Sequence, residues 1–428
     1  MTENTILEVL ADQKEELGSI DTRHWCDRAE ENLFELDSPL AQVVIGVRRS
    51  GKSTICHKVL REHRMKYAYA NFDDDRLFDM KAADLNTLLG CIYQLYGQGI
   101  QHILFDEIQN VEGWHLFVNR LLRMRFHVVI TGSNAKLLSS ELATHLTGRY
   151  NEIRLYPFSF SEYCEYNKVD IHGLTTKSKA SVKAAFVNYL SDGGFPELVH
   201  IRNKRAYVQG LIDTVIKKDI KQRYHLRNTE ALQQIANHLI SNACQEINYD
   251  QLAEQFGIGS AVTTKKYVEY LIQAFLIVQI RKFSYKSRTR LRASKGYVVD
   301  TGLIANRSDV LMPENLGWRM ENVVYIELLR RAAPFYHDVY YHKPSSRNKE
   351  VDFVVCEQGH VIDLIQVSYN IDNSKTLKRE TEALLLAAEY LHCDNLTLIA
   401  LAETRDIVIG SKAIHVVNII EWLLTGNL

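Results

Sequence analysis

Short apolar runs and longer amphipathic stretches alternate along residues 1–160. Apolar runs bounded by glycine or polar residues are typical of buried strands, whereas apolar residues spaced three and four apart predict helices. Residues 1–39 have the spacing of one or two amphipathic helices. Alternating strands and helices then indicate a parallel sheet covered on both faces. The pattern predicts strands at 41–45, 67–72, 103–107, 126–131 and 153–155, and helices at 54–63, 85–96 and 111–123.

The pattern changes beyond this region. Residues 158–225 are predicted to be helical, with a break at 193–197, and we interpret them as a helical lid. Two helices, a glycine turn, a third helix capped by Ser260 and a strand-like run follow, which is typical of a winged helix-turn-helix. Strands and helices near the end of the chain predict a further α/β unit. The predicted parts are 1–35, 36–160, 161–225, 226–295 and 296–428.

A glycine-rich loop follows the first predicted strand. Residues Gly46–Ser53 fit G-x-x-x-x-G-K-[ST], the loop that wraps the phosphates of a nucleotide. Its glycines let the backbone approach phosphate oxygens, and the helix that follows presents N–H groups to the anion. Lys52 is expected to reach the β- and γ-phosphates, and the Ser53 hydroxyl is expected to ligate Mg²⁺. The predicted nucleotide contacts are Gly46, Arg48, Arg49, Ser50, Gly51, Lys52, Ser53 and Thr54.

Two carboxylates end the predicted strand at 103–107 and fit a second nucleotide motif. Asp106 is expected to hold Mg²⁺ through its water shell, and Glu107 is expected to polarise the attacking water. An acidic pair on one strand and a polar end on the next are typical of ATPases that carry an added strand between the two nucleotide strands. Ser133 or Asn134 would then contact the γ-phosphate or the lytic water. The alternative is a plain Gly-Ser-Asn turn.

Arg149 precedes the predicted strand at 153–155. An arginine at such a place is most often a surface charge. In a multimeric ATPase it could instead complete the site of a neighbouring subunit as an arginine finger. Both interpretations stay open.

Composition limits the class of protein further. The chain has 428 residues and a formal net charge of −1, so any nucleic-acid surface must be local. No apolar run approaches the roughly 18 residues of a membrane span, and the start has no signal-peptide pattern. The seven cysteines are scattered without a C-x-x-C pair, which indicates thiols in a reducing compartment. We expect a cytoplasmic protein with no membrane contact and, without a Cys/His cluster, no structural zinc.

A basic segment stands out against this nearly neutral charge. Residues 281–295 hold seven Lys or Arg and no acidic residue, with Phe283 and Tyr285 interleaved. This pattern favours contacts with nucleic-acid phosphates. The alternative is that the winged helix packs against the nucleotide or a neighbouring subunit. The predicted contacts to duplex DNA are Lys265, Lys266, Lys286, Arg288, Arg290 and Arg292.

The last part of the chain has the skeleton of a Mg²⁺ nuclease of the PD-(D/E)xK kind. A helix glutamate, a strand aspartate and a polar residue on the next strand are supplied by Glu321, Asp352 and Gln366. Such a site also needs a lysine to orient water, and Ser368 stands where that lysine is expected. Lys349 or Lys375 could substitute from elsewhere. We predict a retained fold with a degenerate site, and nuclease activity is not expected.

Taken together, these motifs resemble a family of bacterial and archaeal AAA-type ATP-binding proteins. In that family a P-loop ATPase is joined to a winged helix and a nuclease-like domain of unknown function. The resemblance implies binding of ATP and Mg²⁺, and an α/β fold of a P-loop parallel sheet, helical lid, winged helix-turn-helix and restriction-endonuclease-like domain. The matching stretches are Gly46–Ser53, Phe105–Gln109, Thr131–Ser133, Gly148–Arg149, Tyr156–Glu162, Gly193–Glu197, Val299–Leu303, Met320–Asn322 and Glu350–Phe353.

The leading functional hypothesis is an ATP hydrolase that couples its nucleotide state to engagement of duplex DNA or a protein partner. A homo-oligomer is compatible with this reading. Two alternatives stay open. One is an ATP-controlled conformational or oligomeric switch with negligible turnover, and the other is an ATP-regulated nuclease.

Overall fold

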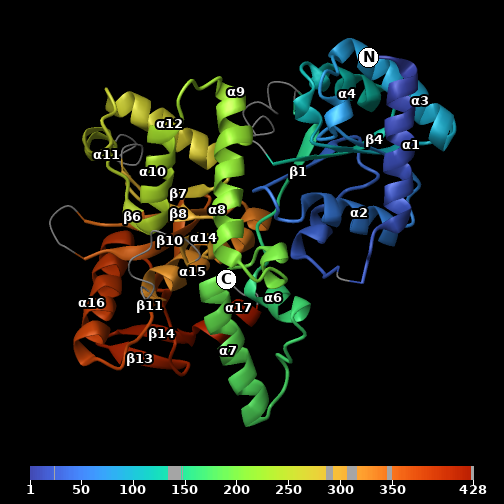
Figure 1. The fold of residues 1–428 in the computed structure, drawn as a ribbon. Helices are drawn as coiled ribbons and strands as arrows, with labels where there is room; N and C mark the ends of the chain where they lie inside the picture. Colours follow the sequence, from blue (N-terminus) through green and yellow to red (C-terminus); the bar gives the residue numbers. More distant parts are fainter. Residues whose placement is uncertain are drawn as a thin grey trace. The chain divides into compact units, whose positions relative to one another are not determined.

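The computed structural model describes residues 1–23, 25–133, 146, 148–285, 293–305, 316–344 and 349–425. Contacts divide the chain into two units (Figure 1). The first unit comprises Met1–Pro157 with Gln273–Phe275, and the second comprises Phe158–Ile272 with Leu276–Leu428. Each unit is built on its own sheet.

The described part of the first unit contains a five-stranded sheet in which all strand pairs are parallel. The strand order is β2-β3-β4-β1-β5. Because β4 lies between β1 and β3, the order confirms the added strand predicted between the two nucleotide strands. The carboxyl ends of parallel strands meet at one edge of the sheet. The strands are β1 (Ala41–Ile45), β2 (Tyr67–Asn71), β3 (His102–Asp106), β4 (His127–Gly132) and β5 (Tyr150–Arg154).

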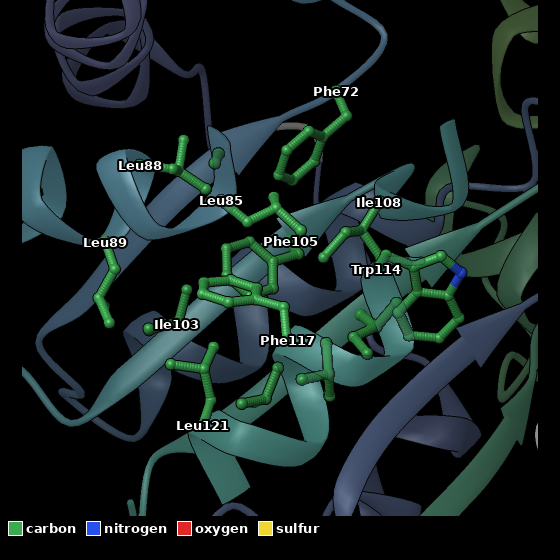
Figure 2. Close-up of a cluster of buried hydrophobic side chains, with 14 of the residues drawn as sticks. Phe72, Leu85, Leu88, Leu89, Ile103, Phe105, Ile108, Trp114, Phe117 and Leu121 are labelled. Carbon is green, nitrogen blue, oxygen red and sulfur yellow. The ribbon is translucent and has the colours of Figure 1, made fainter. Parts of the chain in front are cut away.

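Helices cover both faces of this sheet. One core lies under α1, α3 and α4, and a second core lies under α2. Figure 2 shows the first core, where Phe105 of β3 meets Leu85 of α3 and Phe117 of α4. The helices are α1 (Glu3–Ser19), α2 (Lys52–Glu62), α3 (Leu85–Tyr96) and α4 (Trp114–Arg123), with short 3-10 helices η1 (Ala29–Leu33), η2 (Asp75–Leu77), η3 (Ala82–Asp84) and η4 (Ile108–Asn110).

The first helix, α1, belongs to the core of the first unit. Its residues Ile6, Val9 and Leu10 are fully buried in the same cluster as β3 and α3. The predicted separate part at 1–35 is therefore not separate in the structure. The second amphipathic helix that the spacing allowed there is only the short η1.

Helices open the second unit. The segment predicted as a lid groups with this unit by its contacts. Its elements are α6 (Phe160–Tyr166), α7 (Thr176–Asp192), η6 (Pro196–Val199), α8 (Lys204–Thr214), the π-helix η7 (Val215–Lys221) and α9 (Gln222–Tyr224).

A buried carboxylate, that of Asp300, joins two of the glycine-containing stretches that carry the resemblance. Asp300 accepts hydrogen bonds from the backbone N–H of Gly194 at 2.7 Å and of Gly302 at 2.8 Å. Burial raises the pKa of Asp300 to about 6, against these two hydrogen bonds. A Cβ added at Gly193 would lie 1.8 Å from the Asp300 carboxylate. This contact joins the helical segment to the start of the C-terminal part.

The next elements follow in the order expected of a winged helix, an assignment that stays a prediction. Ser260 caps α12 as predicted, since its Oγ accepts a hydrogen bond from the Thr263 N–H at 3.2 Å. Strands β6 and β7 both pair antiparallel with β8. The elements are α10 (Glu230–Ser241), β6 (Gln245–Glu246), α11 (Tyr249–Gln255), α12 (Ala261–Gln273), β7 (Ile277–Lys282) and β8 (Ser294–Val298).

Over the described residues of the second unit, one sheet of nine strands has the order β13-β14-β12-β11-β10-β9-β7-β8-β6. The predicted hairpin of 350–355 and 361–367 is confirmed, because β10 and β11 pair antiparallel. The predicted boundary at 295/296 is wrong, because it cuts through β8 and β7 pairs with β9. The strands are β9 (Asp338–His342), β10 (Val351–Glu357), β11 (His360–Ser368), β12 (Leu396–Ala400), β13 (Arg405–Ile409) and β14 (Lys412–Asn418).

The remaining helices of the second unit are α14 (Gly302–Ala305), α15 (Leu316–Ala332), η8 (Ala333–Phe335), α16 (Ser374–Leu391) and α17 (Ile419–Thr425). Across the described ranges, no helix has the length and apolar character needed to cross a membrane. All seven cysteines are buried thiols.

Candidate nucleotide-binding site

The glycine-rich loop leaves the carboxyl end of β1 and enters α2. Gly51 is the N-cap of α2 and has a φ of 94°, a conformation that favours glycine. Lys52 and Ser53 form the first turn of α2, where backbone N–H groups have no partner within the helix. The Lys52 Nζ donates a hydrogen bond to the Val47 carbonyl oxygen at 3.0 Å, so the ammonium group lies over the loop. The loop can therefore present N–H groups and a positive charge to a phosphate.

Gly46 is required by a close backbone approach. A Cβ added there would lie 2.1 Å from the Leu155 carbonyl oxygen and 3.3 Å from Ser50 Oγ. The residue therefore holds the start of the loop against the chain that follows β5. No larger side chain fits without moving one of these segments.

Gly46→Ala is expected to lower the free energy of unfolding by about 1–3 kcal/mol, because the new methyl group must displace the Leu155 backbone. Urea denaturation followed by circular dichroism measures this change. Gly99→Ala is the matched control, since a Cβ there meets nothing within 4 Å. If both variants unfold at the wild-type urea concentration, the close approach at Gly46 is not a constraint.

Asp106 is the last residue of β3 and lies level with Thr131 of β4. It is buried, and the Thr131 hydroxyl donates a hydrogen bond to its carboxylate. The Tyr69 hydroxyl lies 3.4 Å from the other carboxylate oxygen. Two hydroxyl groups thus orient the side chain that was predicted to hold Mg²⁺ through water.

Glu107 follows in a left-handed conformation, with a φ of 56°. Its carboxylate accepts hydrogen bonds from the Ser133 N–H at 3.1 Å, from the Ser133 hydroxyl at 3.2 Å and from the Gln109 side-chain amide. Burial raises the pKa of Glu107, whereas the positive charges of Lys52 and Arg48 lower it. The structure therefore brings the predicted base together with one of the two predicted sensor residues.

The strand register shows how the two motifs meet. Ile45, the last residue before the loop, pairs with Gly132, the last residue before Ser133. The carboxyl edge of the sheet therefore carries the loop, the acidic pair and Ser133 together. Arg48 lies 3.7 Å from Asp73, and Arg49 and Thr54 are exposed. Asn134 lies outside the described residues.

Arg149 does not join this group within its own chain. Its carbonyl oxygen accepts a hydrogen bond from the Ala41 N–H at 3.1 Å, at the amino end of β1. In the parallel pair of β1 and β5, Ile45 lies level with Arg154. Arg149 is therefore at the opposite edge of the sheet from the loop. Its role as a finger for a neighbouring subunit stays a prediction.

Arg28 is a residue of this site that the sequence did not reveal. Its guanidinium is buried and donates hydrogen bonds to the carbonyl oxygens of Tyr156 at 2.8 Å and Ser50 at 3.4 Å. It therefore supports the loop from the N-terminal segment. Lys58 of α2 fixes that segment through ion pairs with Asp27 and Glu31, each at 2.7 Å. No local pattern marks Arg28, because its partners are distant in the sequence.

The residues predicted for the nuclease-like site also lie together, in the second unit. The Asp352 N–H donates to Gln366 Oε1 at 3.3 Å, and the Val367 N–H donates to the Asp352 carboxylate at 2.9 Å. Glu321 accepts a hydrogen bond from the Tyr297 hydroxyl at 2.6 Å. Burial and the nearby Glu321 charge raise the pKa of Asp352 well above its usual range.

Lys295 supplies the positive charge of this cluster. It is buried, with its Nζ 3.4 Å from Glu321, and it forms a second ion pair with Glu350. It is therefore not available as a phosphate contact, although it ends the basic segment 281–295. Lys349, one of the two predicted substitutes, lines the same cavity as Asp352 and Gln366 and forms an ion pair with Glu382. Lys375 is exposed.

The described residues proposed for DNA lie on α12. Lys265 and Lys266 are exposed, and Lys265 lies 3.8 Å from Glu269 one turn away. The preceding residue, Thr264, is fully buried and donates a hydrogen bond to the Ser260 carbonyl oxygen. Lys286, Arg288, Arg290 and Arg292 lie outside the described residues.

Comparison with known families agrees with the strand order and the loop. Residues 38–164 match the family model of an AAA domain. Residues 183–313 and 316–417 match two models, each described as a domain of unknown function (DUF8612 and DUF4143). The first unit is therefore an AAA-type P-loop domain with the parallel-sheet core of P-loop ATPases.

Two relatives match nearly the whole chain. Uncharacterized protein MJ1544 of Methanocaldococcus jannaschii is 31% identical over 400 residues, which cover 90% of this chain and 88% of the relative. An uncharacterized protein of Haemophilus influenzae is 30% identical over 412 residues, covering 91% and 95%. The chain belongs to the family of these uncharacterized archaeal and bacterial proteins, as the resemblance predicted.

Solved structures show more distant similarity. The Walker-type ATPase paby2304 of Pyrococcus abyssi is 16% identical with a TM-score of 0.42, covering 65% of this chain and 95% of that chain. The K64R mutant of RuvB from Thermotoga maritima is 16% identical with a TM-score of 0.31, covering 63% and 88%. The fold assignment rests on the strand order and the AAA match.

Proposed function

We propose that the protein is a Mg²⁺-dependent ATP hydrolase that couples its nucleotide state to engagement of duplex DNA or a protein partner. The proposal of ATP hydrolysis rests on the position of Glu107. Its carboxylate is fixed by Ser133 at the same sheet edge as the glycine-rich loop, within the field of Lys52. A carboxylate whose pKa is raised by burial is a better proton acceptor near neutral pH.

The residues at this edge fit ATP and Mg²⁺. The backbone N–H groups of Gly51–Ser53 and the Lys52 ammonium would hold the β- and γ-phosphates. The Ser53 hydroxyl and the Asp106 carboxylate are oxygen donors of the kind that Mg²⁺ prefers. The bound ion would neutralise charge on the phosphates. Glu107 would then orient and deprotonate the attacking water.

The DNA part of the proposal rests on the exposed ammonium groups of α12. Lys265→Gln with Lys266→Gln should weaken binding to duplex DNA, and should make the plot of log affinity against log salt shallower by about 1–2 units. Fluorescence anisotropy over a salt series measures both effects. The matched control is Lys177→Gln with Lys179→Gln on α7, which removes the same charge from exposed positions. Equal slopes for the two double variants would argue against contacts through α12.

A second candidate function is an ATP-controlled switch with negligible turnover. It is favoured by the hydrogen bonds that already engage the Glu107 carboxylate, from Ser133 and Gln109. A protein that changes its elution volume with ATP, and releases no phosphate from it, would fit this candidate.

The carboxylate cluster of the second unit is proposed to be degenerate, so nuclease activity is not part of the proposed function. The Lys295 ammonium pairs with Glu321 and Glu350 and thereby neutralises charge that a metal ion would otherwise balance. Among the described residues, the acidic and histidine groups that converge tightly enough to hold a metal lie elsewhere.

A further inference from the structure

We propose that Asp37, His102 and His127 form a binding site for a divalent transition-metal ion, with Zn²⁺ as the ion that these ligands fit best. The site lies at the amino edge of the sheet in the first unit, away from the glycine-rich loop. It is independent of the proposed ATP hydrolase.

The three ligands converge from separate parts of the chain. His102 opens β3, His127 opens β4, and the two residues are register partners with ring centroids 4.7 Å apart. Asp37 lies in the turn before β1. One ligand atom from each residue lies within 4.8 Å of the other two. A tetrahedral zinc ion with bonds of about 2.1 Å needs ligand atoms about 3.4 Å apart. Asp37 is exposed, so a change of its rotamer can bring its carboxylate oxygen closer to the two imidazole nitrogens.

The turn before β1 also orients both imidazole rings. His127 Nδ1 lies 3.2 Å from the Ser38 carbonyl oxygen, and His102 has a hydrogen bond to the backbone of Leu36. A histidine that binds a metal through one nitrogen usually donates the other N–H to such a carbonyl oxygen. The two carbonyl groups on either side of Asp37 therefore orient both rings, which stack with an interplanar angle of 19°. Because an imidazole nitrogen binds a metal ion in the plane of its ring, one ring must rotate when both bind the same ion.

A buried nitrogen atom of His102 points to a missing ligand. His102 is only 9% exposed, and its Nε2 has no hydrogen-bond partner among the described residues. A buried polar atom without a partner costs free energy, which a bond to a metal ion would remove. Two imidazole nitrogens and one carboxylate oxygen suit zinc far better than Mg²⁺. They leave the fourth position to water.

A second group of converging side chains in the same unit differs from this site, because its charge is already balanced by a lysine. Asp27, Glu31 and Glu62 also converge, but the Lys58 Nζ pairs with them at 2.7, 2.7 and 3.2 Å. That group is already neutralised by an ammonium ion. No such cation pairs with Asp37 among the described ion pairs.

The inference departs from the expectation that the chain has no structural zinc. The site could not be recognised in the sequence, because its ligands, at positions 37, 102 and 127, follow no spaced motif. A bound ion would join the entry of β1 to the amino ends of β3 and β4. We infer that it stabilises the strands whose carboxyl ends carry Asp106 and Ser133.

The test uses the untagged full-length chain, stripped with a chelator and dialysed. Zinc affinity is measured by competition with a chromophoric chelator, and thermal unfolding is followed with and without ZnCl₂. We expect one zinc ion per chain and a rise in Tm of about 5–10 °C at saturation. Replacement of zinc by Co²⁺ should give the visible absorption of a tetrahedral site.

Asp37→Asn and His127→Gln should each lower zinc affinity by about 100-fold and remove most of the shift in Tm. Asp37 is exposed, so its variant is expected to keep the wild-type circular dichroism spectrum. His63→Ala, at an exposed position of the same unit, is the control that should bind zinc as the wild type does. Absence of stoichiometric zinc in the wild type, or equal affinity in all three variants, would mean an adventitious ion only and overturn the proposal.

Discussion

Glu107→Gln should lower the steady-state rate of ATP hydrolysis by about 100-fold or more while ATP still binds. Glutamine keeps the length of the side chain, and its carbonyl oxygen can still accept the hydrogen bond from the Ser133 N–H. It cannot accept a proton from the attacking water. Phosphate release at saturating ATP and Mg²⁺ measures the rate, and isothermal titration calorimetry measures the affinity.

Glu112→Gln is the matched control for this prediction. It makes the same chemical change at an exposed position a few residues further along the chain. It should hydrolyse ATP at the wild-type rate. If Glu107→Gln also retains the wild-type rate, Glu107 is not the base and the assignment of the acidic pair fails.

Lys52→Met should weaken ATP binding by about 100-fold. Methionine preserves much of the aliphatic stem but removes the ammonium group that the structure places over the loop, 3.0 Å from the Val47 carbonyl oxygen. The loss corresponds to about 2.8 kcal/mol at about 1.4 kcal/mol for each tenfold change. Titration with a fluorescent ATP analogue measures the dissociation constant.

The control for Lys52→Met is Lys66→Met, which removes a positive charge from an exposed position of the same unit. It separates a local effect on the phosphates from a change in net charge. Wild-type affinity in Lys52→Met would show that the loop does not bind the phosphates through this lysine.

The parallel sheet and the glycine-rich loop could be predicted from the sequence because their signals are local. The apolar run Ala41–Ile45 leads directly into Gly46, and the loop leads directly into α2. The register that brings Ser133 to Glu107 follows from β4 lying between β1 and β3, an order that the acidic pair and the polar end of the next strand already indicated.

Long-range contacts could not be predicted in the same way. Arg28 contacts the carbonyl oxygen of Tyr156 across 128 positions, and no sequence pattern connects them. Lys295 ends the basic segment 281–295, and its place in that run gives no sign that it is buried. All residues of β8 are buried, however, because the strand lies between β7 and β6. The Lys295 ammonium group on this strand forms ion pairs with Glu321 and Glu350. Burial on both faces of a strand is decided by its neighbours in space.

Steady-state phosphate release from ATP by the wild-type chain, measured in Mg²⁺ and in EDTA, decides whether the protein is a Mg²⁺-dependent ATP hydrolase. We expect linear release over many turnovers in Mg²⁺, and no release above the Glu107→Gln background in EDTA. The same assay with duplex DNA added then tests whether DNA binding changes the rate of ATP hydrolysis. Tight ATP binding in Mg²⁺ with release no faster than that of Glu107→Gln would contradict the hydrolase and leave the ATP-controlled switch.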